Sequence, residues 1–476
     1  MTNIDLLILG IGINPHKTDG VLRFEHYCRA LDLPYQIVGH GNIWRGGMEN
    51  GLPGGGQKIN ELKTVIKNME NKLLVICDTY DLFPVAGERE VLEKYRKLCQ
   101  MDVIMANNPN RKIIISSEIF CWPDKSLAHK YPQIDNKYKY LNSGCIIGFR
   151  DDIYRILEKN MIADDDDDQL YFTLEFFSNN NIILDNKCEL FQTLHGVRDD
   201  IVIHKNRIYN KYTNSYPIFI HGNGPSKLFL NHLENYLEPV RINPSGIADA
   251  EPYQLDYSYT IDNFYNHSRP KVFLALYIDS NQPDKLELFL NSVADINYDN
   301  KMVHVYDSRE NDKIKHSMES IGYIYKPNTM YTFVDFLSTD CKYYFLLEQT
   351  CIITNKNIIN ELVTLCTPHY RIISPLLKNN SNTTFTNYWG AINNNGYYAR
   401  ANDYIDIINY DKRGYWNAPY VSRAILIDRS IIECWDLLKP NKFSISDPDM
   451  ALCLNLRNYT LFMYMVNFNV YGILHC

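Results

Sequence analysis

The chain has 476 residues, of which 45% are hydrophobic and 22% are charged, the balance of a globular protein with about two or three domains. Its formal net charge of −8 argues against general binding to nucleic acid or to an anionic membrane. The first residues have neither the basic nor the apolar segment of a signal peptide, and no apolar run reaches the ~18 residues of a membrane helix. We therefore expect no nucleic-acid partner, no membrane segment and, for the sequence as given, a cytoplasmic protein.

Short apolar strands alternate with helical periodicity in the first half of the chain. Leu6–Leu9 predicts a strand and Val21–Leu31 the helix after it, and further strands are expected at Leu73–Cys77, Ile113–Ser116 and Ile146–Phe149. The second half repeats the pattern, with strands at Val272–Ile278, Met302–Tyr306, Tyr343–Leu347 and Ile372–Ser374 and a helix at Lys285–Val293. This alternation is typical of α/β folds with a mostly parallel sheet.

The segment between the two halves, residues 242–270, is rich in Pro, Ser, Asp and Tyr and has no periodic element. Such composition is typical of a domain boundary. We therefore predict two α/β domains, 1–241 and 271–476, joined by this linker.

Two aspartates, Asp78 and Asp81, follow the predicted strand Leu73–Cys77. Ligands of α/β sheets bind beyond the carboxyl ends of the strands, and two carboxylates three residues apart on a turn can share a divalent cation that also takes phosphate oxygens. A helix N-cap is the alternative interpretation, because aspartate is common at that position.

Two glycine-containing segments add groups suited to a phosphate. Gly54–Lys58 offers backbone N–H groups and one lysine, although a mobile loop explains it equally well. His221 can complete a carboxylate metal site, and Lys227 can neutralise charge that develops on a departing phosphate. A buried or capping histidine is the alternative for His221.

Asp164–Asp168 form a run of five aspartates, and apolar sequence resumes at Leu170. Such a run is normally a solvated acidic loop. Beside a packed segment, it requires a cation, a basic substrate or a catalytic task to balance its charge. Together with the preceding segments, it suits a Rossmann-like sugar-nucleotide transferase.

A series of motifs occurs in a fixed order along the whole chain. Those of the first half are Trp44–Gly47, Gly54–Lys58, Asp78–Asp81, Phe120–Pro123, Leu141–Gly144, Asp164–Gln169 and His221–Lys227; those of the second are Asn387–Gly390, Tyr397–Arg400, Trp416–Tyr420 and Asp447–Met450. In these motifs the chain resembles the procollagen lysyl hydroxylase/glycosyltransferases, in their glycosyltransferase and accessory domains. That family continues into an iron and 2-oxoglutarate dioxygenase domain beyond the equivalent of Cys476, so we expect no lysyl hydroxylation.

The resemblance implies two Rossmann-like GT-A type glycosyltransferase domains, the second a non-catalytic accessory domain. It implies transfer of glucose from UDP-glucose to galactosyl-hydroxylysine of collagen or collagen-like chains, with Mn²⁺ and retention of configuration. Relatives in this family act in the endoplasmic reticulum. The sequence leaves open a homodimer, a UDP-galactose:hydroxylysine galactosyltransferase, and a non-catalytic collagen-binding scaffold that retains a nucleotide pocket.

The resemblance also implies roles for individual residues. Asp78, Asp81 and His221 would bind the metal, and Trp122, Asp167 and Asp168 would line the sugar and acceptor pocket as candidate catalytic groups. The nucleotide would be bound by a further set: Trp44 in a closing loop, Tyr80 on the uracil, and Lys58, Asn223, Gly224 and Lys227 around the phosphates.

The second half lacks an acidic pair at the corresponding place. Glu348–Cys351 follows the strand Tyr343–Leu347, and one glutamate beside neutral groups is a poor metal site. Asp447–Asp449 is interpreted as a turn because of its central proline. The Tyr388–Trp389 and Tyr415–Trp416 pairs are predicted to pack in the core or between domains, with acceptor binding as the alternative.

Overall fold

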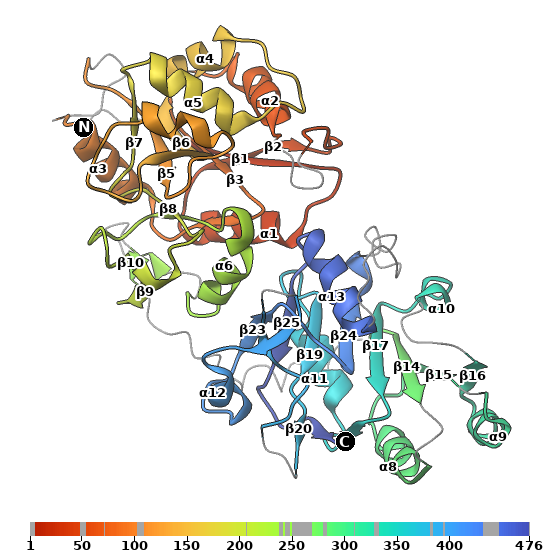
Figure 1. Cartoon of the computed structure of the whole chain (residues 1–476). Helices are drawn as coiled ribbons and strands as arrows, with labels where there is room; N and C mark the ends of the chain where they lie inside the picture. The colour runs from red at the N-terminus through yellow and green to blue at the C-terminus, as the bar shows by residue number, and fades with distance from the viewer. Residues whose placement is uncertain are drawn as a thin grey trace. The chain divides into compact units, whose positions relative to one another are not determined.

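A computed structural model describes residues 5–47, 54–70, 72–101, 109–205, 207–237, 241–242, 248–249, 269–278, 283–308, 310–327, 333–380, 384–393, 396–431 and 447–475. The chain divides into two compact units, Met1–Tyr253 and Gln254–Cys476 (Figure 1). The division falls within the predicted linker 242–270, most of which lies outside the described residues. Within those residues, every helix is too short or too polar to span a bilayer.

The first unit is built on a six-stranded sheet of order β2-β1-β3-β6-β5-β7. Its strands are β1 (Leu6–Asn14), β2 (Tyr35–His40), β3 (Leu73–Asp78), β5 (Ile113–Glu118), β6 (Tyr140–Phe149) and β7 (Ile182–Leu184). The predicted strands are confirmed. The sheet is less parallel than expected, because β6 runs antiparallel to both of its neighbours, β3 and β5.

Helices cover both faces of this sheet (Figure 1). The helices are α1 (Asp19–Ala30), α2 (Gly56–Ile66), α3 (Glu88–Leu98), α4 (Arg150–Lys159) and α5 (Asp168–Ser178). Along β3, Leu73, Val75 and Cys77 pack with apolar residues of α1 and α3, whereas Leu74 and Ile76 pack with those of α2, α4 and α5. Since side chains alternate along a strand, an apolar run buried on both faces produces this α/β/α sandwich.

Smaller elements complete the first unit. They are β4 (Leu82–Pro84), β8 (Phe191–Thr193), β9 (Ile201–His204), β10 (Arg207–Asn210), β11 (Phe219–His221), α6 (Lys227–Glu234), β12 (Arg241–Ile242) and β13 (Ala248–Asp249). The strand β11 pairs with β4 so that His221 lies opposite Leu82, the residue after Asp81. The N–H of Gly222 also donates to the carbonyl of Asp81 at 2.8 Å. This pairing joins segments more than a hundred residues apart at one edge of the unit.

The second unit has an eight-stranded sheet of order β16-β15-β14-β17-β24-β19-β25-β23. Its elements are β14 (Val272–Ile278), α8 (Pro283–Ala294), β15 (Lys301–Asp307), α9 (Asp312–Ser320), β16 (Ile324–Pro327), α10 (Val334–Leu337), β17 (Tyr343–Glu348), β18 (Cys351–Ile353), α11 (Ile358–Leu365), β19 (Ile372–Pro375), β20 (Lys378–Asn379), β21 (Gly390–Ile392), β22 (Tyr398–Arg400), α12 (Tyr404–Ile408), β23 (Tyr415–Ala418), β24 (Ala424–Asp428), α13 (Pro448–Asn458), β25 (Met463–Val466) and β26 (Gly472–Leu474). All the strands and the helix predicted for this half are present.

The two units repeat one topology. The order β2-β1-β3-β6-β5-β7 in the first corresponds to β15-β14-β17-β24-β19-β25 in the second, with the same sequence of parallel and antiparallel pairs. The three-stranded sheet β4-β11-β8 likewise corresponds to β18-β26-β20. The second half is therefore a structural copy of the first, and positions can be compared through the strand registers.

Candidate active site

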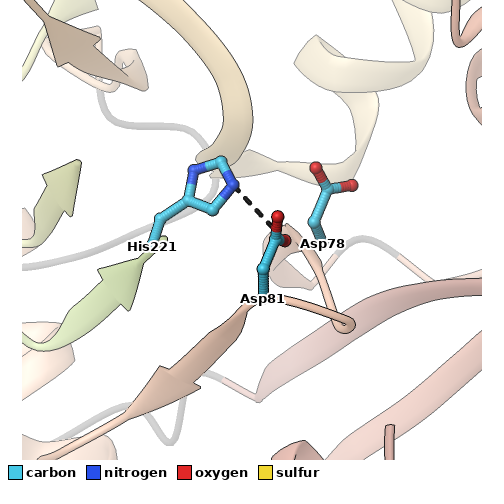
Figure 2. A group of neighbouring side chains, drawn as sticks. All are labelled: Asp78, Asp81 and His221. Atoms are coloured by element: carbon cyan, nitrogen blue, oxygen red, sulfur yellow. Dashed lines mark ion pairs between the residues drawn. The ribbon is translucent and has the colours of Figure 1, made fainter. Parts of the chain in front are cut away.

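Asp78, Asp81 and His221 converge at the carboxyl end of β3 (Figure 2). One ligand atom of each residue lies within 4.8 Å of those of the other two. Asp78 ends β3, Asp81 follows on the turn to β4, and His221 ends β11, which pairs with β4. Within the described part of the chain, this is the one group of three acidic, histidine or cysteine side chains placed to hold a metal ion. Two carboxylates and one imidazole fit a divalent cation such as Mn²⁺.

Two lysines balance the charge of the carboxylates. Lys58 Nζ lies 3.0 Å from Asp78 Oδ1, and Lys227 Nζ lies 3.3 Å from Asp81 Oδ2. Burial alone would raise the pKa of Asp81, but Lys227 and His221 outweigh it and hold that pKa well below its usual range. Burial alone would lower the pKa of Lys58, but Asp168 and Asp78 hold it above its ordinary value. Asp81 is therefore ionised and able to act as a ligand at neutral pH.

A buried amide and carboxylate network sets the proton position on His221. Asn142 Nδ2 donates to Glu118 Oε1 at 3.0 Å, and this orients the amide so that its Oδ1 lies 3.1 Å from His221 Nδ1. An amide oxygen can only accept, so His221 carries its proton on Nδ1. Its Nε2 lies 3.6 Å from Asp81 Oδ1 and is the atom available to a metal. Glu118 also accepts hydrogen bonds from Gln169 and Asn223. These bonds lower the pKa of Glu118, but burial outweighs them and raises it above its ordinary value.

The five aspartates of the acidic run differ in environment, and Asp164 forms an ion pair with Arg45 at 2.9 Å. Asp165 and Asp166 are exposed, Asp167 caps α5 by accepting from the N–H of Leu170 at 2.6 Å, and Asp168 is buried. Asp168 Oδ2 accepts from Ser143 Oγ at 3.1 Å and lies 3.5 Å from Lys58 Nζ. The interpretation of the run as a solvated acidic loop is therefore wrong for Asp168. Lys58 contacts both Asp168 and Asp78, so Asp168 lies beside the metal cluster.

The glycine segment before α2 does not present free amides to a phosphate. The N–H groups of Gly56 and Gln57 donate to the carbonyls of Asp166 and Asp164, at 2.8 and 2.9 Å. Gly55 has a φ of +112°, and a Cβ there would lie 2.5 Å from Asp168 Oδ1. The prediction that backbone N–H groups of this segment bind a phosphate is thus wrong for Gly56 and Gln57, because carbonyls of the acidic run already accept from them. The absence of a side chain at Gly55 and Gly56 instead allows the run to approach.

The other predicted nucleotide residues surround the same region. Tyr80 is half-buried between the two metal-site aspartates, and its hydroxyl has no hydrogen-bond partner among the described residues. Asn223 and Gly224 follow His221, and Lys227 begins α6. Trp44 is folded onto its own loop, where its Nε1 donates to the carbonyl of Gly47 at 3.0 Å. The residues that follow, 48–53, lie outside the described part.

Trp122 borders the site from the strand end of β5. Its side chain is 45% exposed, and its carbonyl accepts from Gln169 Nε2 at 3.3 Å. The sequence interpretation missed Glu118, Ser143 and the roles of Asn142 and Gln169 in the network. The position of Glu118 at the carboxyl end of β5 was the available signal, because ligands of α/β sheets bind there.

The second unit keeps a carboxylate at only one of the three positions of the metal site. The registers place Glu348 at the position of Asp78 and Leu474 at that of His221. Thr350 corresponds to Asp81. The carbonyl of Thr350 accepts from the N–H of His475 at 2.9 Å, just as the carbonyl of Asp81 accepts from the N–H of Gly222. Arg423 Nη1 donates to Thr350 Oγ1 at 2.8 Å and lies 4.0 Å from Glu348 Oε2. A guanidinium thus lies between the two side chains that correspond to Asp78 and Asp81.

One further prediction for the second half is corrected. Asp447 is the N-cap of α13 and accepts from the N–H of Met450 at 3.0 Å, so Asp447–Asp449 begins a helix and is not an isolated turn. Tyr388 and Trp416 are buried as predicted. Trp389 and Tyr415 are half-buried, and Tyr415 packs against the apolar core of the second unit. Burial raises the pKa of Asp449 to about 7, and its Oδ1 has no hydrogen-bond partner within the described residues.

The α/β units and the family comparison define the class of a glycosyltransferase. The PLOD GT domain matches residues 3–246, and the N-terminal domain of glycosyltransferase family 25 matches residues 334–476. The predicted pair of GT-A type glycosyltransferase domains is thereby confirmed. The chain belongs to the PLOD family, the procollagen lysyl hydroxylase/glycosyltransferases.

Similar proteins extend over almost the whole chain. The uncharacterized protein R699 of Acanthamoeba polyphaga mimivirus is 48% identical over 98% of both chains. Procollagen-lysine,2-oxoglutarate 5-dioxygenase 2 of Mus musculus is 31% identical, and the multifunctional procollagen lysine hydroxylase and glycosyltransferase LH3 of Homo sapiens is 28% identical. Each of these two matches 98% of this chain, but the chain spans only 64% of their length.

Proposed function

We propose that the first unit transfers glucose from UDP-glucose to galactosyl-hydroxylysine in collagen or collagen-like chains, and that the transfer requires Mn²⁺. The observation that carries this proposal is the convergence of Asp78, Asp81 and His221 with two lysines at the carboxyl end of β3. The names of the relatives, which describe enzymes that modify procollagen lysine, support the acceptor class. We propose that the second unit is a non-catalytic accessory domain.

Asp78, Asp81 and the Nε2 of His221 would hold the metal. A divalent cation bound there supplies Lewis-acid stabilisation of the diphosphate as the bond to the sugar breaks. Lys227 is 53% exposed, so its ammonium group can move from Asp81 to a phosphate oxygen and neutralise the leaving group. Tyr80, Asn223 and Gly224 would contact the rest of the nucleotide.

Asp168 is the proposed acidic group nearest the reacting sugar. Its contacts with Lys58 and Ser143 fix the carboxylate beside the metal cluster, where it can stabilise positive charge on an oxocarbenium-like sugar. Asp167 holds the start of α5 and thereby positions Asp168. Trp122 would contact the sugars with its exposed ring. Transfer to the same side of the sugar would retain the α configuration.

A galactosyltransferase that acts on hydroxylysine itself would use the same groups, so the test must offer both donors. UDP-glucose and UDP-galactose are each combined with a hydroxylysine peptide and with a galactosyl-hydroxylysine peptide in Mn²⁺, and the products are read by mass. The proposal expects a product with UDP-glucose and the galactosylated peptide. Product only with UDP-galactose and the unmodified peptide would establish the galactosyltransferase, and no product with any combination would favour the non-catalytic scaffold.

A further inference from the structure

We propose that the tilted ring pair of Phe120 and His195 forms a platform that binds the acceptor hexose at the rim of the candidate active site. This inference rests on the proposed function, because it names the subsite for the acceptor sugar of that reaction. It concerns two residues outside the metal, nucleotide and acidic groups considered so far.

The segment after β5 spans both sides of the site. The last residue of β5, Glu118, accepts from Asn223 Nδ2 at 3.0 Å on the side of His221 and from Gln169 Nε2 at 2.9 Å on the side of Asp168. Four residues later, the carbonyl of Trp122 accepts from the same Gln169 amide. Phe120 lies between these two anchors. The backbone of Phe120 is therefore held between two residues that accept from Gln169, the residue after Asp168.

His195 fixes Phe120 beside the nucleotide-binding segment. The two ring centroids lie 4.4 Å apart with an interplanar angle of 38°. The N–H of His195 donates to Asn223 Oδ1 at 3.0 Å, and a Cβ on Gly224 would lie 3.4 Å from His195 Nδ1. The ring pair is thus continuous with the segment that we assign to the nucleotide.

Gly196, the residue after His195, leaves space for the Phe120 ring. Gly196 has a φ of +75°, and a Cβ there would lie 2.8 Å from Ile119 Cδ1 and 2.9 Å from Phe120 Cε2. Any other residue at this position would meet both a left-handed backbone and a steric clash. The close approach of the two segments therefore depends on glycine.

The exposure of Phe120 indicates a binding surface. The side chain is 42% exposed although it packs on His195, and Trp122, two residues away, is 45% exposed. Ligand sites combine aromatic surface with a few polar groups. A hexose with one face of C–H bonds suits the Phe120 ring, and the imidazole of His195 can bond to a hydroxyl at its edge. A terminal galactose has this chemistry.

The test uses Phe120→Ala and His195→Ala in the full chain, with Phe120→Trp as the conservative variant and Tyr212→Ala as a matched control. Tyr212 is a 49% exposed aromatic residue of the same unit, and it contacts Lys137 and Tyr138, which are not residues of the candidate site. Binding of methyl β-galactoside is measured by saturation-transfer NMR in UDP and Mn²⁺, and the KM of the galactosylated peptide is measured by turnover.

We expect Phe120→Ala to weaken galactoside binding and raise the peptide KM by about tenfold or more, with rescue by Phe120→Trp and unchanged UDP affinity. Galactoside binding and KM within about twofold of the parent in both alanine variants would overturn the inference while leaving the proposed function intact. Conversely, Phe120-dependent galactoside binding in a chain that transfers no sugar would support the platform and refute the proposed function.

Discussion

Arg423 of the second unit stands at the register position that Gly144 holds in the first. Gly144 precedes Cys145, which pairs with Cys77 of β3, and Arg423 precedes Ala424, which pairs with Leu347 of β17. A Cβ on Gly144 would lie 2.2 Å from the His221 ring, so the metal-binding histidine requires glycine there. In the copy, Leu474 replaces this histidine, and the Arg423 guanidinium extends to Thr350 and Glu348. The Arg423 guanidinium of the second unit thus lies at the position where the first unit would hold a metal ion.

The first prediction follows from this replacement and concerns metal stoichiometry. Titration with Mn²⁺, followed by electron paramagnetic resonance, should give one tight site per chain. Asp78→Ala should remove it, because two remaining ligands hold a divalent cation poorly. Glu348→Ala, the matched change in the second unit, should leave it in place. A tight site that survives Asp78→Ala would show that the second unit binds metal despite Arg423.

The second prediction separates two aspartates of the acidic run. Asp168→Asn should reduce sugar transfer by about a hundredfold or more, because it removes a fixed charge beside the reacting sugar. Asp165 is exposed, so Asp165→Asn should keep turnover within about threefold of the parent, since exposed charges contribute little. Initial rates at saturating donor measure both variants, and affinity for UDP and Mn²⁺ should change little. Equal rates in the two variants would contradict the assignment of Asp168.

The third prediction concerns the bond that fixes the His221 tautomer. Asn142→Leu should weaken Mn²⁺ affinity by about 10- to 100-fold, the usual effect of removing a partner that orients a metal ligand. Ser117→Ala is the control, because its hydroxyl donates to the carbonyl of Asp185 instead. Calorimetric titration with Mn²⁺, supported by thermal melts of both variants, measures the effect. Unchanged affinity in a folded Asn142→Leu protein would remove Asn142 from the site.

Local patterns in the sequence predicted the strands and the aspartates at the end of β3. Leu73–Cys77 is an apolar run, and Asp78 and Asp81 follow it directly, so their place was readable from the general position of ligands in α/β sheets. The neighbourhood of His221 depends on the pairing of β11 with β4, which joins distant segments and has no local signal. The position of His221 after a strand-like segment suggested a ligand from the residues alone, and the resemblance to a known family also implied it.

Other parts of the site depend on backbone contacts that residue types do not reveal. Gly54–Lys58 has the composition of a phosphate loop, but the carbonyls of Asp164 and Asp166 occupy the N–H groups of Gln57 and Gly56. Asp447–Asp449 contains a proline that suits either a turn or the first position of a helix, and the capping bond to Met450 decides for the helix. The aspartate run likewise separates into exposed, capping and buried members only once α5 is placed.

The fourth prediction is a pH dependence of stability in the second unit. Burial raises the pKa of Asp449 from its ordinary value of 3.8 to about 7, so between these values the folded state binds a proton that the unfolded state has lost. Stability should therefore fall as pH rises through this window, by about 1.4 kcal/mol per pH unit, and level off above pH about 7. Asp449→Asn should remove this loss, since it cannot ionise.

Thermal unfolding of the parent and Asp449→Asn between pH about 4 and 8 measures this effect. The difference in melting temperature should be small at the acidic end and grow in favour of Asp449→Asn towards neutral pH. Asp406→Asn, at a half-exposed side chain, is the control and should follow the parent. Parallel curves for the parent and Asp449→Asn would show that Asp449 is paired when ionised.

The most direct test of the central claim is the metal dependence of sugar transfer in Asp78→Ala and Asp81→Ala. Transfer from UDP-glucose to a galactosyl-hydroxylysine peptide is followed by mass and by NMR of the new glycosidic bond, with added Mn²⁺ and with a chelator. We expect the parent to form a configuration-retained product only with Mn²⁺, and both variants to lose turnover and Mn²⁺-dependent UDP binding, because the diphosphate charge would lack its counter-ion. Full turnover in both variants, or in the chelated parent, would contradict the account.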